Sequence, residues 1–187
     1  IFFTLSMLAT NGIIYSSNLL TTFVFYEILT IATYPLVTFK GDKKSIINGK
    51  KYLYYLLGTS IIFFLPAIIF TYILTGTLDY KVGGIFTSYN NTAIYILVIL
   101  YLFGIAKSAV MPFHKWLPSA MVAPTPVSAL LHAVAVVKSG VFIMLKVFLF
   151  IFGVDVLTQS GANIIIILFA SFTIISSSFI ALNQDNI

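Results

Sequence analysis

Long apolar runs separated by short polar turns make up the pattern of this chain. Because crossing a bilayer takes about 20 mostly apolar residues, the pattern predicts six membrane-spanning helices. None of the runs alternates in polarity as a strand does, so an all-α transmembrane bundle is expected. The predicted helices are Ile1–Ile14, Leu19–Phe39, Lys51–Leu74, Ala93–Met111, Pro126–Ile151 and Ile164–Leu182.

Composition agrees with this pattern and narrows the function. Only 8% of the 187 residues are charged, against about a quarter in an average globular domain, which marks a membrane protein. The chain has no cysteine, so disulfides, iron–sulfur clusters and thiolate metal sites are excluded. It also has no glycine-rich phosphate loop and no dinucleotide-binding fingerprint. No metal, cofactor or catalytic chemistry is therefore expected in this chain.

The distribution of charge predicts the orientation of the helices. Five lysines and one aspartate lie in the segment Lys40–Lys51, and the positive-inside rule places this segment in the cytoplasm. Alternation of the helices then places the segment Thr75–Asn91 outside and the segment Pro112–Thr125 inside. A topology signal is the favoured interpretation of the lysine cluster, and an anionic-lipid site is the alternative. The net charge of +5 comes from dispersed lysines, so no nucleic-acid partner is expected.

Four ionisable residues lie inside apolar segments, where a lysine costs at least about 2.5–3.5 kcal/mol to insert. Glu27 lies in the middle of the second predicted helix, and Lys107 lies near the end of the fourth. His132 and Lys138 share the fifth helix, where their spacing places them about 120° apart around the axis. Such residues mark ion paths or pair with one another, so these four are the candidate path residues. The alternatives are a neutral, hydrogen-bonded Glu27 between helices and a Lys107 that reaches the interface or the C-terminal dipole of its helix. For His132 the alternative is a hydrogen-bonded structural histidine, and for Lys138 it is pairing between helices.

Prolines punctuate the chain next to these residues. Pro112 cannot donate a backbone hydrogen bond and disfavours helical geometry in the residue before it. The helix that carries Lys107 is therefore expected to break between Lys107 and Phe113, with its irregular backbone shielded from lipid. In the same segment, Trp116 is predicted to be an interfacial aromatic anchor and His114 to be structural.

The run from Ala106 to Gly140 reads AKSAVMPFHKWLPSAMVAPTPVSALLHAVAVVKSG. It resembles the signature segment of the proton-translocating antiporter-like membrane subunits. These subunits occur in respiratory complex I (NADH–quinone oxidoreductase), in Mrp-type cation/proton antiporters and in energy-converting membrane hydrogenases. The match covers nearly all positions from Lys107 to Ala133, with one departure at Val110, where many members carry glutamine.

The resemblance implies a family core of two inverted five-helix bundles. Residues 1–187 would then be a single antiporter-like domain taken from a longer protein, with 1–151 in the first bundle and 164–187 opening the second. It also implies that Glu27 pairs with Lys107 and that His132 is a proton-path histidine. A relay role for Lys138 is implied less generally, because several members carry lysine at this position while others carry threonine.

Pattern and resemblance together predict a subunit that moves protons, or exchanges Na+ for H+, through Glu27, Lys107, His132 and Lys138. Lys138 and its surroundings favour the Mrp-type antiporter branch. The alternative is a proton-pumping subunit of NADH–quinone oxidoreductase or of a membrane-bound hydrogenase, driven by electron transfer in other subunits. A non-conducting scaffold is disfavoured by four ionisable groups inside spans. The expected partners are other membrane subunits and the lipid bilayer, in a bacterial or archaeal cell membrane.

Overall fold

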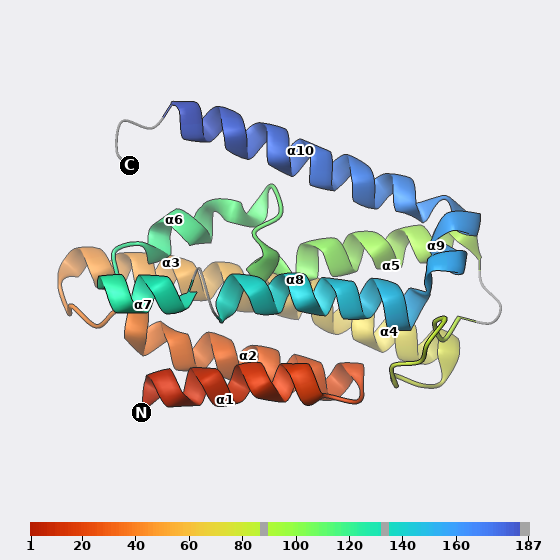
Figure 1. Ribbon diagram of the computed structural model, residues 1–187, viewed down its shortest axis with the longest axis horizontal. Helices are drawn as coiled ribbons and strands as arrows, with labels where there is room; N and C mark the ends of the chain where they lie inside the picture. The colour runs from red at the N-terminus through yellow and green to blue at the C-terminus, as the bar shows by residue number, and fades with distance from the viewer. Residues whose placement is uncertain (87–89, 132–134, 184–187) are drawn as a thin grey trace.

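The computed structural model describes residues 1–86, 90–131 and 135–183. Within these residues the backbone is helical apart from turns and one isolated bridge between Asn18 and Asp79, in agreement with the predicted all-α class. Most helices run along the long axis of the molecule, and α10 covers one side of the bundle (Figure 1). The elements in chain order are α1 (Phe2–Tyr15), α2 (Leu19–Val37), α3 (Lys43–Thr59), the π-helix η1 (Ser60–Phe64), α4 (Leu65–Thr75), α5 (Asn91–Gly104), the 3₁₀ turns η2 (Ala106–Ser108) and η3 (Phe113–Lys115), α6 (Trp116–Ala120), α7 (Thr125–Ala129), α8 (Val136–Lys146), the π-helix η5 (Val147–Phe152), α9 (Val154–Ser160) and α10 (Ala162–Leu182).

Three helical runs in the described residues are long and apolar enough to cross a membrane. They are α2, the continuous run α3–η1–α4, and α10. The run α8–η5 makes a fourth only together with α9, which is bent away from it by 79°. Helices α1 and α5 have 14 residues each, fewer than the about 20 that cross a bilayer. Of the six predicted spans, length and composition thus support three, or four with the bent pair.

The long helical run begins at Lys43 rather than at the predicted Lys51, because Asp42 caps it. The Asp42 carboxylate accepts a hydrogen bond from the backbone N–H of Ser45 at 3.1 Å, which satisfies a free donor of the first turn. Hydrogen bonds from Ser45 hold the pKa of the Asp42 carboxyl below its usual range. Most of the lysine-rich segment is therefore helix, and the run Lys43–Thr75 reaches 33 residues.

The helix before Lys107 ends earlier than predicted. α5 ends at Gly104 rather than at Met111, and the chain then forms only the turns η2 and η3 before α6. Lys107 therefore lies in the turn η2, and the segment that follows it up to Pro112 is not helical. The chain is interrupted around Lys107 as expected, but the interruption begins before this lysine rather than after it.

The helix predicted from Pro126 to Ile151 is divided as well. α7 ends at Ala129, and α8 is a separate helix that continues into the π-helix η5. Lys138 lies on α8, whereas His132 lies outside the described residues.

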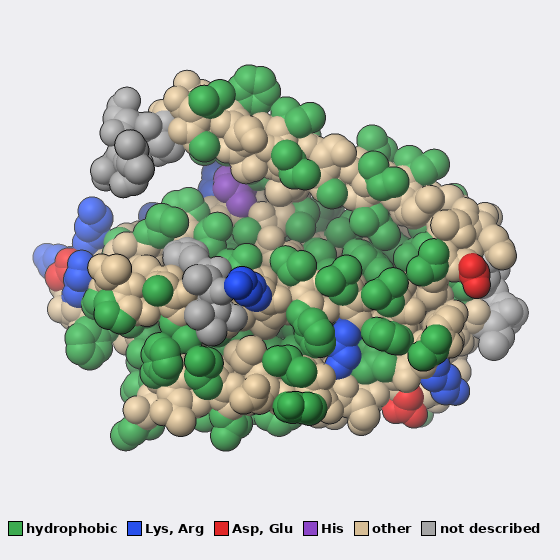
Figure 2. Space-filling view, in the orientation of Figure 1, with side chains coloured by type: hydrophobic (Ala, Val, Ile, Leu, Met, Phe, Trp, Pro, Cys, Tyr) green, Lys and Arg blue, Asp and Glu red, His purple; other side chains and the backbone are tan. Residues whose placement is uncertain are grey.

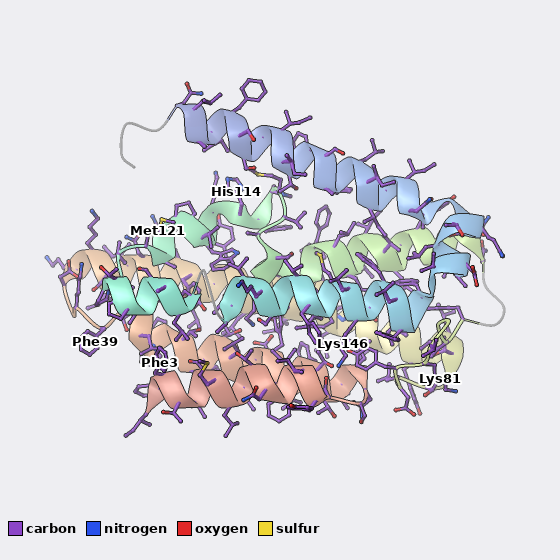
Figure 3. All side chains as sticks on the ribbon, viewed as in Figure 1. Phe3, Phe39, Lys81, His114, Met121 and Lys146 are labelled. Carbon is purple, nitrogen blue, oxygen red and sulfur yellow. The ribbon has the colours of Figure 1, made fainter. Side chains whose placement is uncertain are left out.

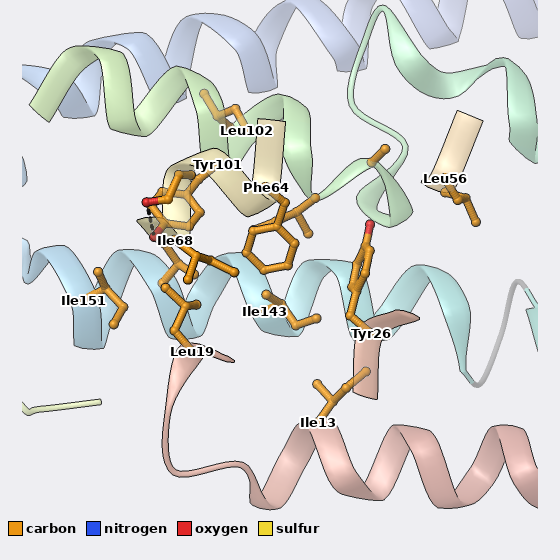
Figure 4. Close-up of a cluster of buried hydrophobic side chains, with 14 of the residues drawn as sticks. Ile13, Leu19, Tyr26, Leu56, Phe64, Ile68, Tyr101, Leu102, Ile143 and Ile151 are labelled. Carbon is orange, nitrogen blue, oxygen red and sulfur yellow. Dashed lines mark hydrogen bonds between the residues drawn. The ribbon is translucent and has the colours of Figure 1, made fainter. Parts of the chain in front are cut away.

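Buried aliphatic and aromatic side chains from neighbouring elements pack together in the centre of the bundle (Figure 4). Tyr26 of α2 contacts Phe64 of η1 edge to face, with ring centroids 5.4 Å apart. Phe64 contacts Tyr101 of α5 in the same manner at 6.0 Å, and Ile143 of α8 lies in the same buried cluster. This core fixes α2, η1, α5 and α8 around the place where the chain breaks after Gly104.

α10 lies against this bundle with little burial. Ala162 is its only buried residue. Two contacts attach its middle to the rest: the Phe169 ring packs on Phe103 at 5.2 Å, and the Thr173 hydroxyl accepts a hydrogen bond from the Met111 N–H at 3.2 Å. One of the few ties of α10 to the bundle is therefore made to the broken segment itself.

The segment 77–86 closes the end of the bundle that lies opposite the lysine-rich end (Figure 1). Its backbone bonds to the start of α2, through Leu19 N–H to the Leu78 carbonyl at 2.9 Å. It also bonds to the end of η5, through Ile85 N–H to the Ile151 carbonyl at 2.9 Å. A Cβ atom at Gly84 would collide with the backbone of η5, so this close approach requires glycine.

Candidate functional site

Lys107 is fully buried at the centre of the bundle, on the turn that follows α5. Its ammonium donates hydrogen bonds to the backbone carbonyl of Tyr26 and to the hydroxyl of Thr30, both at 2.6 Å. Nζ also lies 3.1 Å from the centroid of the Tyr26 ring. All these groups belong to α2 and are neutral, so polar groups and an aromatic face, rather than a carboxylate, surround the Lys107 side-chain nitrogen.

Two glycines let the Lys107 turn approach its neighbours closely. A Cβ atom at Gly140 of α8 would lie 2.5 Å from the carbonyl carbon of Lys107. A Cβ atom at Gly104 would lie 2.5 Å from the backbone nitrogen of Phe64 in η1. Ala109 adopts a left-handed conformation with φ 57°, which costs a non-glycine residue roughly 1–3 kcal/mol and is found mainly at functional sites. The chain around Lys107 thus accepts a costly backbone in order to place this side chain.

The broken backbone next to Lys107 is hydrogen-bonded inside the protein. The Tyr26 hydroxyl accepts from the backbone N–H of Lys107 at 3.3 Å and donates to the carbonyl of Gly104 at 3.5 Å, so it bridges the break. The Trp116 indole donates to the Ala106 carbonyl at 2.8 Å. These bonds replace those of a continuous helix, as irregular backbone within a membrane requires.

Trp116 does not have the exposed ring that the predicted interfacial anchor requires. Its side chain is fully buried and packs edge to face on Tyr52, with ring centroids 5.7 Å apart. The ring lies inside because its N–H bonds to the broken backbone. His114, in the same hinge, lies below α10 (Figure 3), and its Nδ1 atom is buried with no hydrogen-bond partner among the residues that the structure describes.

Glu27 lies beside the Lys107 site without bonding to it. Both carboxyl oxygens of Glu27 are buried, and neither makes a hydrogen bond of regular geometry within the described part of the chain, although the Ser60 hydroxyl of η1 is close enough to interact with this carboxyl group. Glu27 and Lys107 are close enough to interact electrostatically, but the ammonium bonds to Tyr26 and Thr30 instead. A buried carboxylate without a partner needs a proton or a cation. Direct contact between Glu27 and Lys107 is absent in this state and stays a prediction for another one.

Lys138 is exposed on this chain, and its place on the path stays a prediction. It lies two positions before Gly140, about 200° around the helix from it, and Gly140 faces the Lys107 turn. Lys138 therefore points away from Lys107. It lines a surface groove of ≈ 290 Å³ together with Thr10 of α1. His132 lies outside the described residues, so the structure does not relate it to either lysine.

Hydroxyl groups line one buried face of α2, and the sequence prediction did not include them. Their spacing of four, four and three residues repeats as a helix does, and this periodicity on both sides of Glu27 was the signal. One of them holds Lys107, and another, at the lysine-rich end, shares a hydrogen bond of 2.6 Å with the Tyr52 hydroxyl. The stripe consists of Thr22, Tyr26, Thr30 and Thr33, all fully buried.

A second lysine, Lys146 of α8, is buried at the C-terminal end of α1 (Figure 3). Its ammonium donates to the Ser16 carbonyl at 2.8 Å, to the Ser16 hydroxyl at 3.0 Å and to the Ile13 carbonyl at 3.3 Å. The Ser16 hydroxyl bonds to Thr22 at 2.7 Å, and Thr22 bonds to the Tyr80 hydroxyl at 2.8 Å. Burial raises the pKa of Tyr80, so this hydroxyl keeps its proton.

Comparison with known proteins decides the family. The profile described as NADH:quinone oxidoreductase/Mrp antiporter, transmembrane, matches residues 16–187. This chain belongs to that family. A protein of Staphylococcus aureus (strain MRSA252) named as antiporter subunit mnhA2 is 34% identical over 149 residues, which cover 78% of this chain and 19% of that protein. The chloroplastic NAD(P)H-quinone oxidoreductase subunit 5 of Manihot esculenta is 34% identical over 155 residues, which cover 79% of this chain and 20% of that protein.

Solved structures share the architecture. A chain of the archaeal membrane-bound sulfane sulfur reductase superposes with a TM-score of 0.80 and 29% identity, covering 98% of this chain and 37% of that one. A chain of the Mrp complex from Dietzia sp. DQ12-45-1b superposes with a TM-score of 0.70 and 28% sequence identity. The superposition covers 84% of this chain and 18% of that one. The family predicted from the segment Ala106–Gly140 is thus confirmed. The chain spans about a fifth of the length of the curated relatives it matches.

Proposed function

We propose that this chain is part of an ion-translocating membrane subunit in which Lys107 performs the central step. The observation that carries the proposal is the Lys107 site itself. The fully buried Lys107 side chain lies on a broken helix among neutral groups of α2, and the buried Glu27 carboxyl group lies beside it with no cation in contact. Ionisable groups within membrane spans are costly, and they are retained where they serve ion pathways.

The Lys107 ammonium has two available positions in this proposal. In the first it bonds to Tyr26 and Thr30, as in this structure. In the second it pairs with Glu27 after rotation of the long lysine side chain. Pairing favours the charged form of both groups, and separation disfavours it. Moving Lys107 between these positions would therefore bind and release a proton in turn.

The proposed route continues through His132 to Lys138. Lys138 points away from Lys107, so the proposal needs an intermediate group between the two lysines, and we assign this role to His132 from the sequence. Lys138 then opens onto the groove between α1 and α8, where a lysine among apolar side chains needs a polar or acidic partner. We assign that partner to the remainder of a longer protein, which in the family plan is the second of two inverted bundles, or to a neighbouring subunit.

A Mrp-type cation/proton antiporter is the favoured assembly, with Na+ exchanged for H+ in a bacterial or archaeal cell membrane. Lys138 and the staphylococcal relative support it. A proton-pumping NADH–quinone oxidoreductase is the second candidate, because chloroplastic subunit 5 matches at the same identity of 34%. Purification of the assembled complex separates the two. Small antiporter subunits without redox groups favour the first, and subunits with iron–sulfur clusters or flavin favour the second.

Infrared difference spectroscopy tests the proposed step at Glu27. When an ion gradient drives the complex in proteoliposomes, a protonated carboxyl band should appear or disappear. The band should be missing in Glu27→Gln and altered in Lys107→Met. Continued transport by the wild type without any such band would refute the proposed proton exchange between Lys107 and Glu27.

The orientation proposed for the helices has its own test. This chain has no native cysteine, so a cysteine introduced at Lys43 or Lys81 would be its single labelling site. A reagent that cannot cross the membrane, added from outside the cell, should label Lys81→Cys and leave Lys43→Cys unlabelled. Labelling of Lys43→Cys instead would reverse the orientation.

A further inference from the structure

Four lysines share one exposed face at the start of α3. At 100° per residue they fall within an arc of about 120°, and two large exposed side chains lie inside the same arc. The opposite face of these turns is buried, through Ser45, Gly49 and Tyr52. We call this face the lysine stripe; it consists of Lys43, Lys44, Ile47, Lys50, Lys51 and Tyr54, all exposed.

The length of the helix places the lysine stripe at the membrane surface. The run Lys43–Thr75 has 33 residues, or about 50 Å at 1.5 Å per residue, whereas the hydrocarbon core is about 30 Å thick. Roughly 13 residues therefore extend beyond the hydrocarbon. Because the run is apolar up to its far end at Thr75, the extending residues are those from Lys43 to about Tyr55.

A groove next to the stripe provides room for a polar ligand. It has a volume of ≈ 590 Å³ and runs between the start of α3 and α6. Lys40 and Lys44 line one side, and Met121, which is 60% exposed, lines the other. Asp42 also lines the groove, but its carboxylate already accepts the N–H of Ser45. Lysine side chains gather at this end of the molecule in Figure 2.

We propose that the lysine stripe binds the phosphate headgroups of anionic phospholipids in the leaflet on its side of the membrane. A lysine near a membrane surface increases affinity for anionic lipid about fivefold. Exposed Ile47 and Tyr54 add contact with the upper acyl chains, where aromatic and apolar groups collect. A topology signal requires lysines only on one side of the membrane. It does not require them on one face of a helix, so the shared arc is the feature that the lipid site explains.

Lipid retention by the assembled complex tests this site. The complex is held in micelles with equal amounts of phosphatidylglycerol and phosphatidylcholine, and its bound lipids are identified by native mass spectrometry. Lys50→Gln should lower the preference for phosphatidylglycerol about fivefold, and Lys43→Gln with Lys50→Gln about 25-fold. The matched control Lys81→Gln removes one charge at the opposite end and should leave the preference unchanged. Lys50→Arg keeps the charge and should keep the preference.

Ionic strength gives an independent measurement on the wild type, where no variant can misfold. About 1 M salt reduces the Debye length to about 3 Å and should abolish the preference for the anionic lipid. Equal preference in the wild type and in the Lys43→Gln, Lys50→Gln variant would overturn the proposal. Loss of a peripheral protein subunit from that variant, with lipid binding unchanged, would also overturn it and assign the stripe to an acidic protein surface.

Discussion

Two buried lysines, Lys107 and Lys146, differ in what surrounds them. Lys107 lies on a short turn after α5, and the Glu27 carboxyl group lies beside it with no cation in contact. Lys146 lies in the continuous run α8–η5 and bonds to the carbonyls at the C-terminal end of α1. Both are lysines in largely apolar surroundings, but among the described residues a carboxyl group lies near Lys107 and none is found to act on Lys146.

In the proposed mechanism, this difference separates a lysine that changes its position, Lys107, from a lysine that anchors a helix end, Lys146. A cation at the C-terminal end of a helix is stabilised by the helix dipole and by carbonyls that the helix leaves free. Lys146 cannot lose these acceptors unless α1 moves, so it is expected to stay in place. The Tyr26 carbonyl that accepts from Lys107 also accepts a hydrogen bond from the Thr30 hydroxyl at 3.1 Å. Tyr26 and Thr30 would therefore stay bonded to each other if the Lys107 side chain moved to Glu27.

Removal of each lysine should give the largest contrast. Lys107→Ala should reduce ion flux through the assembled complex to background while the protein still inserts, because Glu27 then has no cation. Lys146→Met should lower stability by about 2–3 kcal/mol, as expected for lost hydrogen bonds to a charged group, and leave flux per molecule near that of the wild type. Flux and protein abundance are measured in the same proteoliposomes. Equal loss of flux per molecule in both variants would end the distinction.

Glu27 should matter nearly as much as Lys107. Glu27→Ala should abolish or strongly reduce flux, because the second position of the ammonium is lost. Glu27→Asp should do less harm, since it keeps the charge and shortens the reach by about one carbon. If Glu27 only stabilised the fold, the alanine variant would lower abundance and leave flux per molecule unchanged.

Gly140→Ala tests whether the Lys107 turn needs its position against α8. The added methyl group meets the backbone of this turn and should cost about 1–3 kcal/mol by overpacking. Flux should fall severalfold as Lys107 shifts away from α2. Gly58→Ala is the control, because nothing lies within 4 Å of an added Cβ there, and it should leave flux unchanged. Normal flux in Gly140→Ala would show that the turn tolerates displacement.

The fold was predictable where one local signal dominates. α2 begins at the predicted Leu19, and α10 ends at the predicted Leu182, because both are long apolar runs with polar flanks. The start of α3 was missed because a single cap at Asp42 outweighs the polarity of the lysines that follow. The end of α5 was missed because the break depends on close packing of Gly104 against η1, which lies far away in sequence.

The candidate site was predictable in part. Its charged groups stand out because a charge in an apolar run is rare, which is why Glu27 and Lys107 were found. Thr30 was missed because a threonine in such a run is unremarkable until its periodic neighbours are considered. The exposure of Lys138 follows from its position opposite Gly140 on α8, and Lys146 gains its role from the end of α1. Such relations between distant elements are not visible in one helix.

Thr30→Val should have a moderate effect on the Lys107 side of the comparison. The substitution keeps the shape and removes one of two acceptors of the ammonium, worth about 1.5 kcal/mol or about tenfold in the population of this position. Flux should fall less than in Lys107→Ala, because the Tyr26 carbonyl remains. Thr33→Val, whose hydroxyl bonds to Tyr52 instead, is the control and should leave flux unchanged. The two variants would behave alike if Thr30 served only the packing of α2.

Tyr80→Phe should give the smallest effect, on the Lys146 side. It removes the hydroxyl that bonds to Thr22 but keeps the ring that lies 4.3 Å from the Lys146 ammonium. The loss of one hydrogen bond should lower the free energy of unfolding by about 1 kcal/mol, as measured by thermal unfolding, with unchanged flux. Lys146 keeps its bonds to Ser16 in this variant, so an anchor should be indifferent to the change. A loss of flux comparable to that of Thr30→Val would place the Lys146 end on the ion path, and the two lysines would then have to be regarded as parts of one route.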